Sequence, residues 1–220
     1  KQHQQVIEEI EKNKGSSILM VGYNRRFSPH IQKMKSLLAQ ISEPKSFVMT
    51  MNAGAIPPEH WVHDKAKGGG RIIGEACHFI DLMRYLAGHE IVSVQARRMT
   101  NGTTEIVEDK AVIILGFADG SFGTINYLAN GASSYPKEKI DVFAGNKVLS
   151  LDNFRKLRGY GFSNFSKMNL WQQDKGQTAC AQAFIEAINQ GKASPIPLAE
   201  ILEVSKVTLQ AADILARQED

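Results

Sequence analysis

The sequence predicts an α+β protein with one large, mostly antiparallel open sheet and helices packed on one face. Three observations predict it: strand-like runs follow one another through the middle of the chain, turn residues join them as hairpins, and helical patterns lie at both ends. The strand-like runs cover 45–53, 91–99, 110–117, 121–129, 138–144 and 147–152, with weaker runs at 154–159 and 168–173. Because hairpins pair neighbouring strands antiparallel, we expect one face of the sheet to remain open.

Turn residues support two of these hairpins. Asp119 and Gly120 separate one pair of apolar runs, and Gly145 and Asn146 separate another. The helices expected outside the sheet cover 1–14, a segment that begins at Ser28 and Pro29, and two closing segments within 175–191 and 194–218. The hairpins and the closing helices therefore agree on the same fold class.

The start of the chain predicts a domain boundary. A helix over 1–14 is followed by the apolar run 18–21, which is typical of a buried and possibly parallel strand. These two elements resemble the end of one domain joined to a complete second one. We therefore expect residues 1–22 to be the last helix and strand of a missing N-terminal domain and residues 23–220 to form a C-terminal domain.

Composition limits the classes of function. Charged residues make up 22% of the chain and hydrophobic residues 43%, with a net charge of +3, as in ordinary globular proteins. The cations are scattered, so no nucleic-acid partner is expected. No apolar run reaches the roughly 20 residues of a membrane helix, so no membrane partner is expected. Cys77 and Cys180 are far apart and favour reduced thiols in a cytoplasmic protein.

The stretch GGGRIIGEACHFIDLMRYLAGHE, residues 68–90, places three polar side chains on an apolar helix. Glu75, His78 and Asp81 recur every three residues, so a regular helix would place them on one face. A histidine near its ordinary pKa can accept or donate a proton at neutral pH, and a carboxylate can fix its tautomer. The alternative is a histidine hydrogen-bonded within the core.

Polar residues also cluster in the preceding loop, IPPEHWVHDKAKGGG, where His60 and Trp61 are candidates for ligand contact. A divalent metal site is an alternative interpretation of this region. Its possible ligands are His60, His63, Asp64, Glu75 and His78. Their spacing matches no standard zinc signature, so we expect no metal.

YNRRF directly follows the predicted strand 18–21. Side chains at the carboxyl end of a parallel strand face the crevice in which α/β folds bind ligands. Asn24, Arg25 and Arg26 are therefore candidates for contact with a polar or anionic ligand. The alternative is that the two arginines are solvated or cover the first helix. The chain contains no G-x-G-x-x-G, P-loop or G-x-S-x-G motif.

Three stretches together resemble the glucose-fructose oxidoreductase, inositol dehydrogenase and rhizopine-catabolism family (Gfo/Idh/MocA). They are LMVGYNRRFSPHIQKMKSLL, GGGRIIGEACHFIDLMRYLAG and KGQTACAQAFIEAINQGKASPIPLAEILEVSKVTLQAA. The resemblance implies a C-terminal domain of the dihydrodipicolinate-reductase-like type, entered after a lost Rossmann domain. It also implies NAD or NADP as cofactor of the full-length enzyme, with none bound by this fragment.

The resemblance assigns roles to residues. His78 matches the signature histidine that acts as acid/base or orients the substrate carbinol. Gly69, Gly70 and Asp81 match structural positions of the signature helix, and the candidates of the preceding paragraphs would lie near substrate and cofactor. Many members carry an aspartate four residues before the histidine, where this chain has Gly74 followed by Glu75.

Whether Glu75 replaces that aspartate stays open, since a shift of one residue turns a helical side chain by about 100°. The form GGGRIIGEACHFID also resembles a bi-domain oxidoreductase branch, in which this domain follows a zinc-dependent alcohol-dehydrogenase-like segment.

The expected function is therefore that of a substrate domain. The full-length protein would be an NAD(P)-dependent dehydrogenase that oxidises a secondary alcohol of a sugar or cyclitol derivative, and the fragment alone would be inactive. A homo-oligomer formed through the sheet face is expected. The alternatives are a free-standing sugar-binding or oligomerisation domain without catalysis, and metal-assisted hydrolysis or isomerisation around His60, His63 and Glu75.

Overall fold

The computed structural model of the chain describes residues 2–13, 17–64, 66–99 and 109–218. Its centre is an eight-stranded sheet in the order β2-β3-β4-β1-β5-β6-β7-β8. β1 pairs with β4 in parallel, and the other neighbouring pairs are antiparallel. The strands are β1 (Ser46–Asn52), β2 (Ile91–Arg98), β3 (Lys110–Phe117), β4 (Phe122–Leu128), β5 (Glu138–Ala144), β6 (Lys147–Asp152), β7 (Lys156–Tyr160) and β8 (Lys167–Asn169). The predicted α+β class and the mostly antiparallel sheet are confirmed.

Both predicted hairpin turns are present. The β3–β4 turn contains Gly120 at φ 86°, and the β5–β6 turn contains Gly145 and Asn146 at φ 53° and 57°. Two successive positive φ angles give the turn a twist that matches the twist of the strands, and glycine and asparagine tolerate them best. Local turn chemistry thus sets the register of these two strand pairs.

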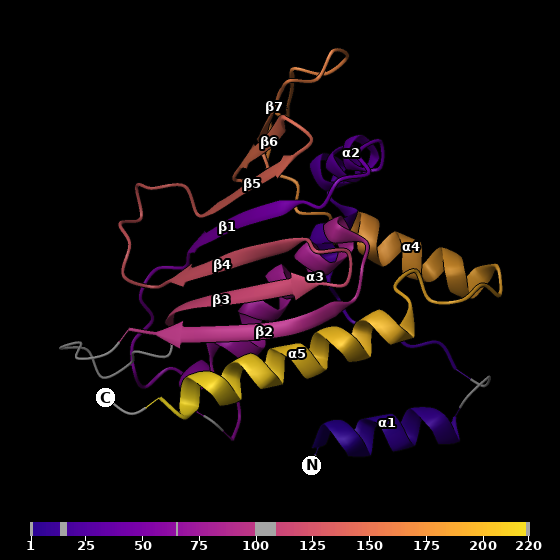
Figure 1. Ribbon diagram of the computed structural model, residues 1–220. Coiled ribbons are helices and arrows are strands. Elements are labelled where there is room, and N and C mark those ends of the chain that lie inside the picture. Colours follow the sequence, from indigo (N-terminus) through magenta and orange to yellow (C-terminus); the bar gives the residue numbers. More distant parts are fainter. Residues whose placement is uncertain (1, 14–16, 65, 100–108, 219–220) are drawn as a thin grey trace.

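Five α-helices accompany the sheet in the described part of the chain (Figure 1). They are α1 (Gln2–Lys12), α2 (Pro29–Leu38), α3 (Cys77–Ala87), α4 (Gln177–Asn189) and α5 (Leu198–Ala216). Short 3-10 turns cover Asn24–Phe27 and Trp61–His63, and a π-helix covers Ile72–Ala76 directly before α3. None of the helices in these described segments is both long and apolar enough to cross a membrane.

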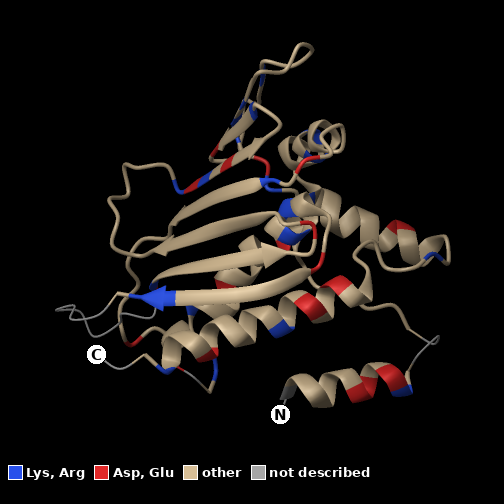
Figure 2. Ribbon diagram, viewed as in Figure 1, with Lys and Arg blue, Asp and Glu red and all other residues tan. Residues whose placement is uncertain are grey.

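The core lies between one face of the sheet and the helices α3 and α5, which pack against each other. Alternate residues of the strands, such as Met49 and Ile113, point into it, and α3 contributes Phe79 and Met83. The opposite face of the sheet is open and partly apolar. Its exposed members include Val48, Ile114, Phe122, Phe143 and Tyr160. Figure 2 shows that the central strands carry few charged residues, in contrast to the helices.

The start of the chain differs from the prediction. Residues 17–23 form no strand, and Leu19 is 42% exposed. A strand needs a neighbour for its backbone N–H and C=O groups, and no described segment pairs with this run. Ser28 does precede α2, but its hydroxyl donates to the carbonyl of Asp174 at 2.8 Å instead of capping the helix.

We expect Gly123→Ala to lower the free energy of unfolding by about 1–3 kcal/mol, because the added methyl overpacks the core. A Cβ at position 123 would lie 2.6 Å from the Cβ of Phe47 and 2.7 Å from the Sδ of Met83. Gly74→Ala is the matched control, since a Cβ there meets nothing within 4 Å. Alanine favours helix over glycine by up to about 1 kcal/mol, so this variant should be neutral or more stable. Urea denaturation of both variants measures the difference, and equal destabilisation would contradict the packing argument.

Candidate active site around His78

The three glycines before the π-helix hold the backbone in a tight turn. Gly69 and Gly70 have φ angles of 69° and 88°, a region that residues with a Cβ rarely adopt. A Cβ on Gly68 would lie 2.5 Å from the backbone of Val62, so this residue packs directly against the turn Trp61–His63. The run therefore fixes where the signature helix begins.

The π-helix changes the phase of the polar residues that follow. A π-turn spaces its hydrogen bonds by five residues, so side chains on either side of it lose the regular three-residue stacking of an α-helix. Glu75 lies within the π-helix, whereas His78 and Asp81 lie in α3. The three residues therefore do not follow one regular helix as expected, and Glu75 and Asp81 have different hydrogen-bond partners.

Glu75 belongs to a network that joins the π-helix to the sheet. Arg71 Nε donates to its Oε1 at 3.0 Å, and the Tyr127 hydroxyl donates to its Oε2 at 2.6 Å. Arg71 also donates to the carbonyl of Gly54 at 2.6 Å, just beyond β1, and lies 3.6 Å from Asp109. Burial acts to raise the pKa of Glu75, but the bonds from Arg71 and Tyr127 outweigh it and hold this pKa below its usual value. Glu75 is thus an ionised clamp on the helix, and no hydrogen bond joins it to His78 within the described segments.

Asp81 anchors α3 to the start of the domain. It is fully buried, and Arg26 donates from Nε and Nη2 to its two carboxylate oxygens. Arg26 Nη1 also reaches Glu200 of α5 at 2.9 Å. This guanidinium therefore bridges α3 and α5. It was predicted to face a ligand, but the structure buries it in this ion-pair cluster.

His78 is oriented differently from both carboxylates. It lines a cavity of about 370 Å³ between the residues that precede α2, the π-helix and α5. The other lining residues are Val21, Gly22, Tyr23, Ile73, Gly74, Cys77, Ser205, Thr208 and Leu209. The ring of Tyr23 meets the imidazole edge-on with centroids 5.9 Å apart, and Nδ1 of His78 is buried without a hydrogen-bond partner among the described residues. Burial, followed by the charge of Arg25, lowers the pKa of His78 to about 4.

A buried group of charges lies near His78. Arg25 donates from Nε and Nη2 to the carboxylate of Glu138 at 3.0 and 3.1 Å, and Lys175 Nζ lies 2.6 Å from Glu138 Oε1. All three charges act on the imidazole of His78. Asn24 supports the group, since its Nδ2 donates to the carbonyl of Lys175 at 2.7 Å. Of the predicted YNRRF residues, Asn24 and Arg25 therefore lie in the His78 region.

Glu138 and Lys175 were missed by the sequence analysis. Glu138 is the first residue of the predicted strand 138–144, and Lys175 is the first residue of the predicted helical segment 175–191. Charged residues are common at the ends of such elements. One signal was available: Glu138 occupies a core-facing position of β5, with its side chain fully buried. A carboxylate at an alternating apolar position needs a cationic partner.

The loop that precedes the glycine run does not join this group. His60 and Trp61 are exposed and face each other, with ring centroids 5.8 Å apart. Nδ1 of His60 accepts from the backbone N–H of Val62. No contact places either ring against His78 in the segments that the structure describes. In the same segments no group of three or more His, Cys, Asp or Glu residues could hold a metal ion.

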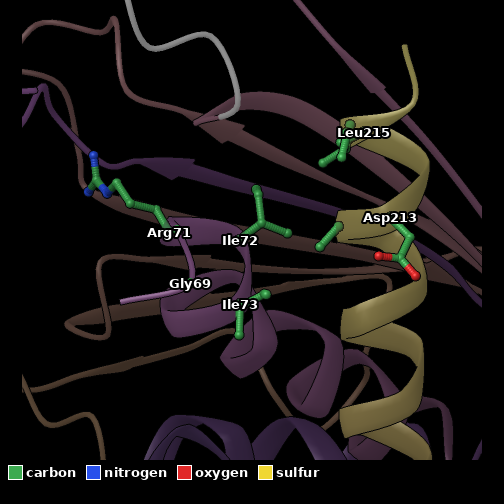
Figure 3. Close-up of a pocket in the computed structure, with 9 residues that line it drawn as sticks. Gly69, Arg71, Ile72, Ile73, Asp213 and Leu215 are labelled. Carbon is green, nitrogen blue, oxygen red and sulfur yellow. The ribbon is translucent and has the colours of Figure 1, made fainter. Parts of the chain in front are cut away.

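A second cavity of about 230 Å³ lies beside the start of the π-helix (Figure 3). Ile73 lines both this cavity and the one at His78, so the two lie next to each other along α5. Figure 3 shows Arg71 pointing away from α5, while Asp213 and Leu215 project from α5 on the other side of Ile72. The walls of this second cavity are mostly apolar. The Arg71 guanidinium is paired with Glu75.

This arrangement can bind a hydroxyl group and accept its proton. An imidazole that is uncharged at neutral pH has one nitrogen able to accept a hydrogen bond. Two cations, Arg25 and Lys175, act on it together with two carboxylates, Glu138 and Glu75, and the cations would stabilise negative charge that develops on a bound oxygen. Both features suit chemistry that removes a proton from an alcohol.

We expect Asp81→Asn to lower the free energy of unfolding by about 3–5 kcal/mol, because it leaves the buried Arg26 without its main counter-charge. Asp213→Asn is the control, since Asp213 is exposed on α5 and should change stability by no more than about 0.5 kcal/mol. Thermal or urea unfolding gives both values. A small effect at position 81 would mean that Glu200 alone neutralises Arg26.

Stability should fall in mild acid because of His78. Its pKa is about 4 in the folded chain and about 6.5 when unfolded, so the unfolded state binds more protons between these values. The stabilisation is complete above about pH 6.5 and decreases toward pH 4, by up to about 3 kcal/mol for this residue. His30, whose pKa burial also lowers, acts in the same direction. The free energy of unfolding, measured with urea at several pH values in this range, should change less steeply with pH for His78→Asn than for the wild type. His89→Asn, which alters a half-exposed histidine, is the control and should behave like the wild type. The same pH dependence of the free energy of unfolding in His78→Asn and the wild type would show that His78 does not cause the loss of stability in acid.

Comparison with known proteins shows the family of the chain. A family model described as the GFO/IDH/MocA C-terminal domain matches residues 31–147, more than half of the chain. Myo-inositol 2-dehydrogenase of Thermotoga maritima is 29% identical over 152 residues, which are 66% of this chain and 44% of the relative. Inositol 2-dehydrogenase of Rhizobium meliloti is 28% identical over 149 residues, which are 62% of this chain and 42% of the relative.

The chain thus spans less than half the length of these curated relatives. A solved levoglucosan dehydrogenase in complex with NADH and levoglucosan superposes with a TM-score of 0.80 at 18% identity. That superposition covers 99% of this chain and 69% of the other, and it supports the fold. The chain belongs to the Gfo/Idh/MocA oxidoreductase family and contains its C-terminal domain.

Proposed function

We propose that the chain is the substrate domain of an NAD(P)-dependent dehydrogenase that oxidises a secondary alcohol of a sugar or cyclitol. One observation carries the proposal: His78 lines a cavity of about 370 Å³ and keeps a buried ring nitrogen without a partner among the described residues. The volume lies within the roughly 300–1,000 Å³ typical of small-molecule sites. A histidine that lines such a cavity and has a ring nitrogen unpaired among the described residues suits a substrate hydroxyl.

In this proposal His78 orients the hydroxyl of the carbon to be oxidised and accepts its proton. The low pKa keeps the imidazole uncharged, so it is ready to accept a hydrogen bond at neutral pH. Arg25 and Lys175 stabilise the alkoxide character that develops as the proton leaves. Glu138 holds both cations in place.

The nicotinamide cofactor, when bound, supplies the acceptor for the hydride. Two glycines of the cavity fit a flat ring beside His78, because a Cβ on Gly22 or Gly74 would occupy space that the structure leaves open. The chain carries no dinucleotide fingerprint of its own. We therefore propose that a Rossmann domain preceding residue 23 binds the dinucleotide and that this chain alone is inactive. NAD and NADP are equally compatible with the proposal.

The choice of substrate class follows from the relatives. Two of them are named inositol 2-dehydrogenases, and a structural neighbour is named levoglucosan dehydrogenase. Cyclitols and anhydrosugars share a ring of secondary alcohols, which is why we propose a polyhydroxy ring as the substrate.

The open sheet face supports a second function, self-association. Val48, Ile114, Phe122, Phe143 and Tyr160 form an exposed apolar surface across the strands. Such a surface usually has a partner, and we propose a second copy of the chain. A non-catalytic domain that only binds sugars or only oligomerises would also have this face. Catalysis by His78 therefore distinguishes the dehydrogenase domain from the non-catalytic domain.

Replacing His78 by asparagine in the whole protein that contains this chain should lower kcat for polyol oxidation by about 10²–10⁴-fold, because proton transfer is lost. Reduction of the nicotinamide, followed by absorbance with myo-inositol and related polyols, measures the rate. His89→Asn is the matched control and should leave the rate unchanged, since His89 lies outside the cavity. Wild-type turnover by the His78 variant would support the non-catalytic binding domain.

A further inference from the structure

A polar cavity, called the lysine cavity below, lies at the opposite end of α3 from His78. It has a volume of about 320 Å³ and is lined by the last residues of α2 and α3 and by the loop that leads into β1. Two lysines, Lys35 and Lys45, are among its walls. His78 is the second residue of α3 and Ala87 the last, so about 14 Å of helix separates this cavity from His78. No residue lines both cavities.

Lys45 is a buried cation with a fixed position. Its backbone N–H donates to the hydroxyl of Ser121 at 2.8 Å, and its carbonyl accepts from the N–H of Phe122 at 3.0 Å. The residue is only 7% exposed, and its ammonium donates to the carbonyl of Glu43 at 3.3 Å. No carboxylate in the described ranges forms an ion pair with it. Because a buried charge is costly without a counter-charge, Lys45 favours an anionic partner from outside the chain.

Lys35 brings a second ammonium to the same cavity. Its Nζ donates to the carbonyl of Tyr85 at 2.6 Å and lies 5.2 Å from the centroid of that ring. A Cβ on Gly88, which also lines the cavity, would lie 3.0 Å from this Nζ. Burial lowers the pKa of Lys35, and the charge of Lys45 acts in the same direction. An ammonium has three donors, and the described residues accept one from each lysine, so both can bind further oxygen atoms.

Asp119 is near enough to act on this charge, but it has other partners. The charge of Lys45 acts on it electrostatically. Its carboxylate accepts from the N–H of Ser121 at 3.0 Å and from the hydroxyl of the same residue at 2.8 Å. It also lies 3.6 Å from Nε2 of His89. Asp119 therefore forms no ion pair with Lys45 itself.

The same holds for the carboxylate that acts on the second lysine. Glu200 acts electrostatically on Lys35. Its own carboxylate is ion-paired with Arg26 at 2.9 Å. Neither lysine thus has an ion-pair partner in the described part of the chain, and the lysine cavity has a positive charge of about two.

We propose that the lysine cavity is a phosphate-binding site, in which the ammonium groups of Lys45 and Lys35 hold either free phosphate or the phosphate group of a small monoester. A phosphate group carries a charge of about −1.5 to −2 at neutral pH and several acceptor oxygens, which matches two ammonium groups with donors to spare. The volume is near the lower end of the roughly 300–1,000 Å³ typical of small-molecule sites. The site lies apart from His78 and does not depend on the proposed function.

Calorimetric titration of the chain of residues 1–220 with inorganic phosphate, at an ionic strength held constant with sodium chloride, tests the proposal. We expect one phosphate to bind each chain. Lys45→Met should weaken this binding by about 10–100-fold, because a charge-assisted hydrogen bond is lost. Lys35→Met should weaken it in the same way. Lys206→Met, which removes an exposed lysine of α5 outside the cavity, is the control and should bind like the wild type.

Thermal unfolding provides a second measurement. Phosphate should raise the Tm of the wild type and of Lys206→Met, since a ligand that binds only the folded state stabilises it, but not the Tm of Lys45→Met. Without phosphate, Lys45→Met should be at least as stable as the wild type, because it removes a buried unpaired cation. Should that variant fail to fold, Lys35→Met decides the question.

The source of the phosphate group is distinguished by a parallel titration with glycerol 3-phosphate. Tighter binding than that of inorganic phosphate would assign the site to a phosphorylated small molecule, and binding of inorganic phosphate alone would assign it to free phosphate. If neither binds the wild type, or if Lys45→Met binds equally well, the proposal is wrong and the lysines serve only to cap carbonyl groups. His78→Asn should bind phosphate like the wild type, so the failure of this inference and the failure of the proposed function are separate results.

Discussion

Two consecutive arginines hold this domain together at the point where its elements meet. The 3-10 turn Asn24–Phe27 directs Arg26 toward Asp81 of α3 and Glu200 of α5, and directs Arg25 toward Glu138 of β5. A buried charge without its partner costs several kcal/mol, so helix and strand positions that separate these pairs are strongly disfavoured. The ion pair between Arg26 and Asp81 therefore restricts the rotation of α3, the helix that carries His78.

The polar residues of the signature helix are divided among separate tasks. Glu75 is bound by Arg71 and Tyr127, and Asp81 is bound by Arg26, so both carboxylates serve the packing of the helix. His78 keeps an unsatisfied buried nitrogen among the described residues and lines a cavity. Unsatisfied polar atoms are rare in protein interiors and call for an explanation. Substrate binding in an oxidoreductase of this family provides one.

Much of the fold could be predicted from the sequence. The main strand-like runs, the turn residues at Gly120 and at Gly145–Asn146, and the closing helices lie where the structure has them, whereas the weaker run 168–173 is a strand only up to Asn169. These features depend on residues close together in the chain, through alternation, turn chemistry and helical periodicity. The strand expected over 18–21 was wrong because a strand also needs a neighbour, which an apolar run alone cannot guarantee.

The sequence by itself thus determined the α+β class, the hairpins and the choice of His78 as the residue to examine. Only the tertiary structure decided which charges surround it. Arg25, Glu138 and Lys175 lie far apart in the chain and meet because β5, the turn before α2 and the segment before α4 converge. Likewise, the π-helix separates Glu75 from His78 where a regular helix would align them. Helical spacing predicts which residues share a face of a regular helix, whereas long-range ion pairs and a local change in hydrogen bonding arise only when the elements pack.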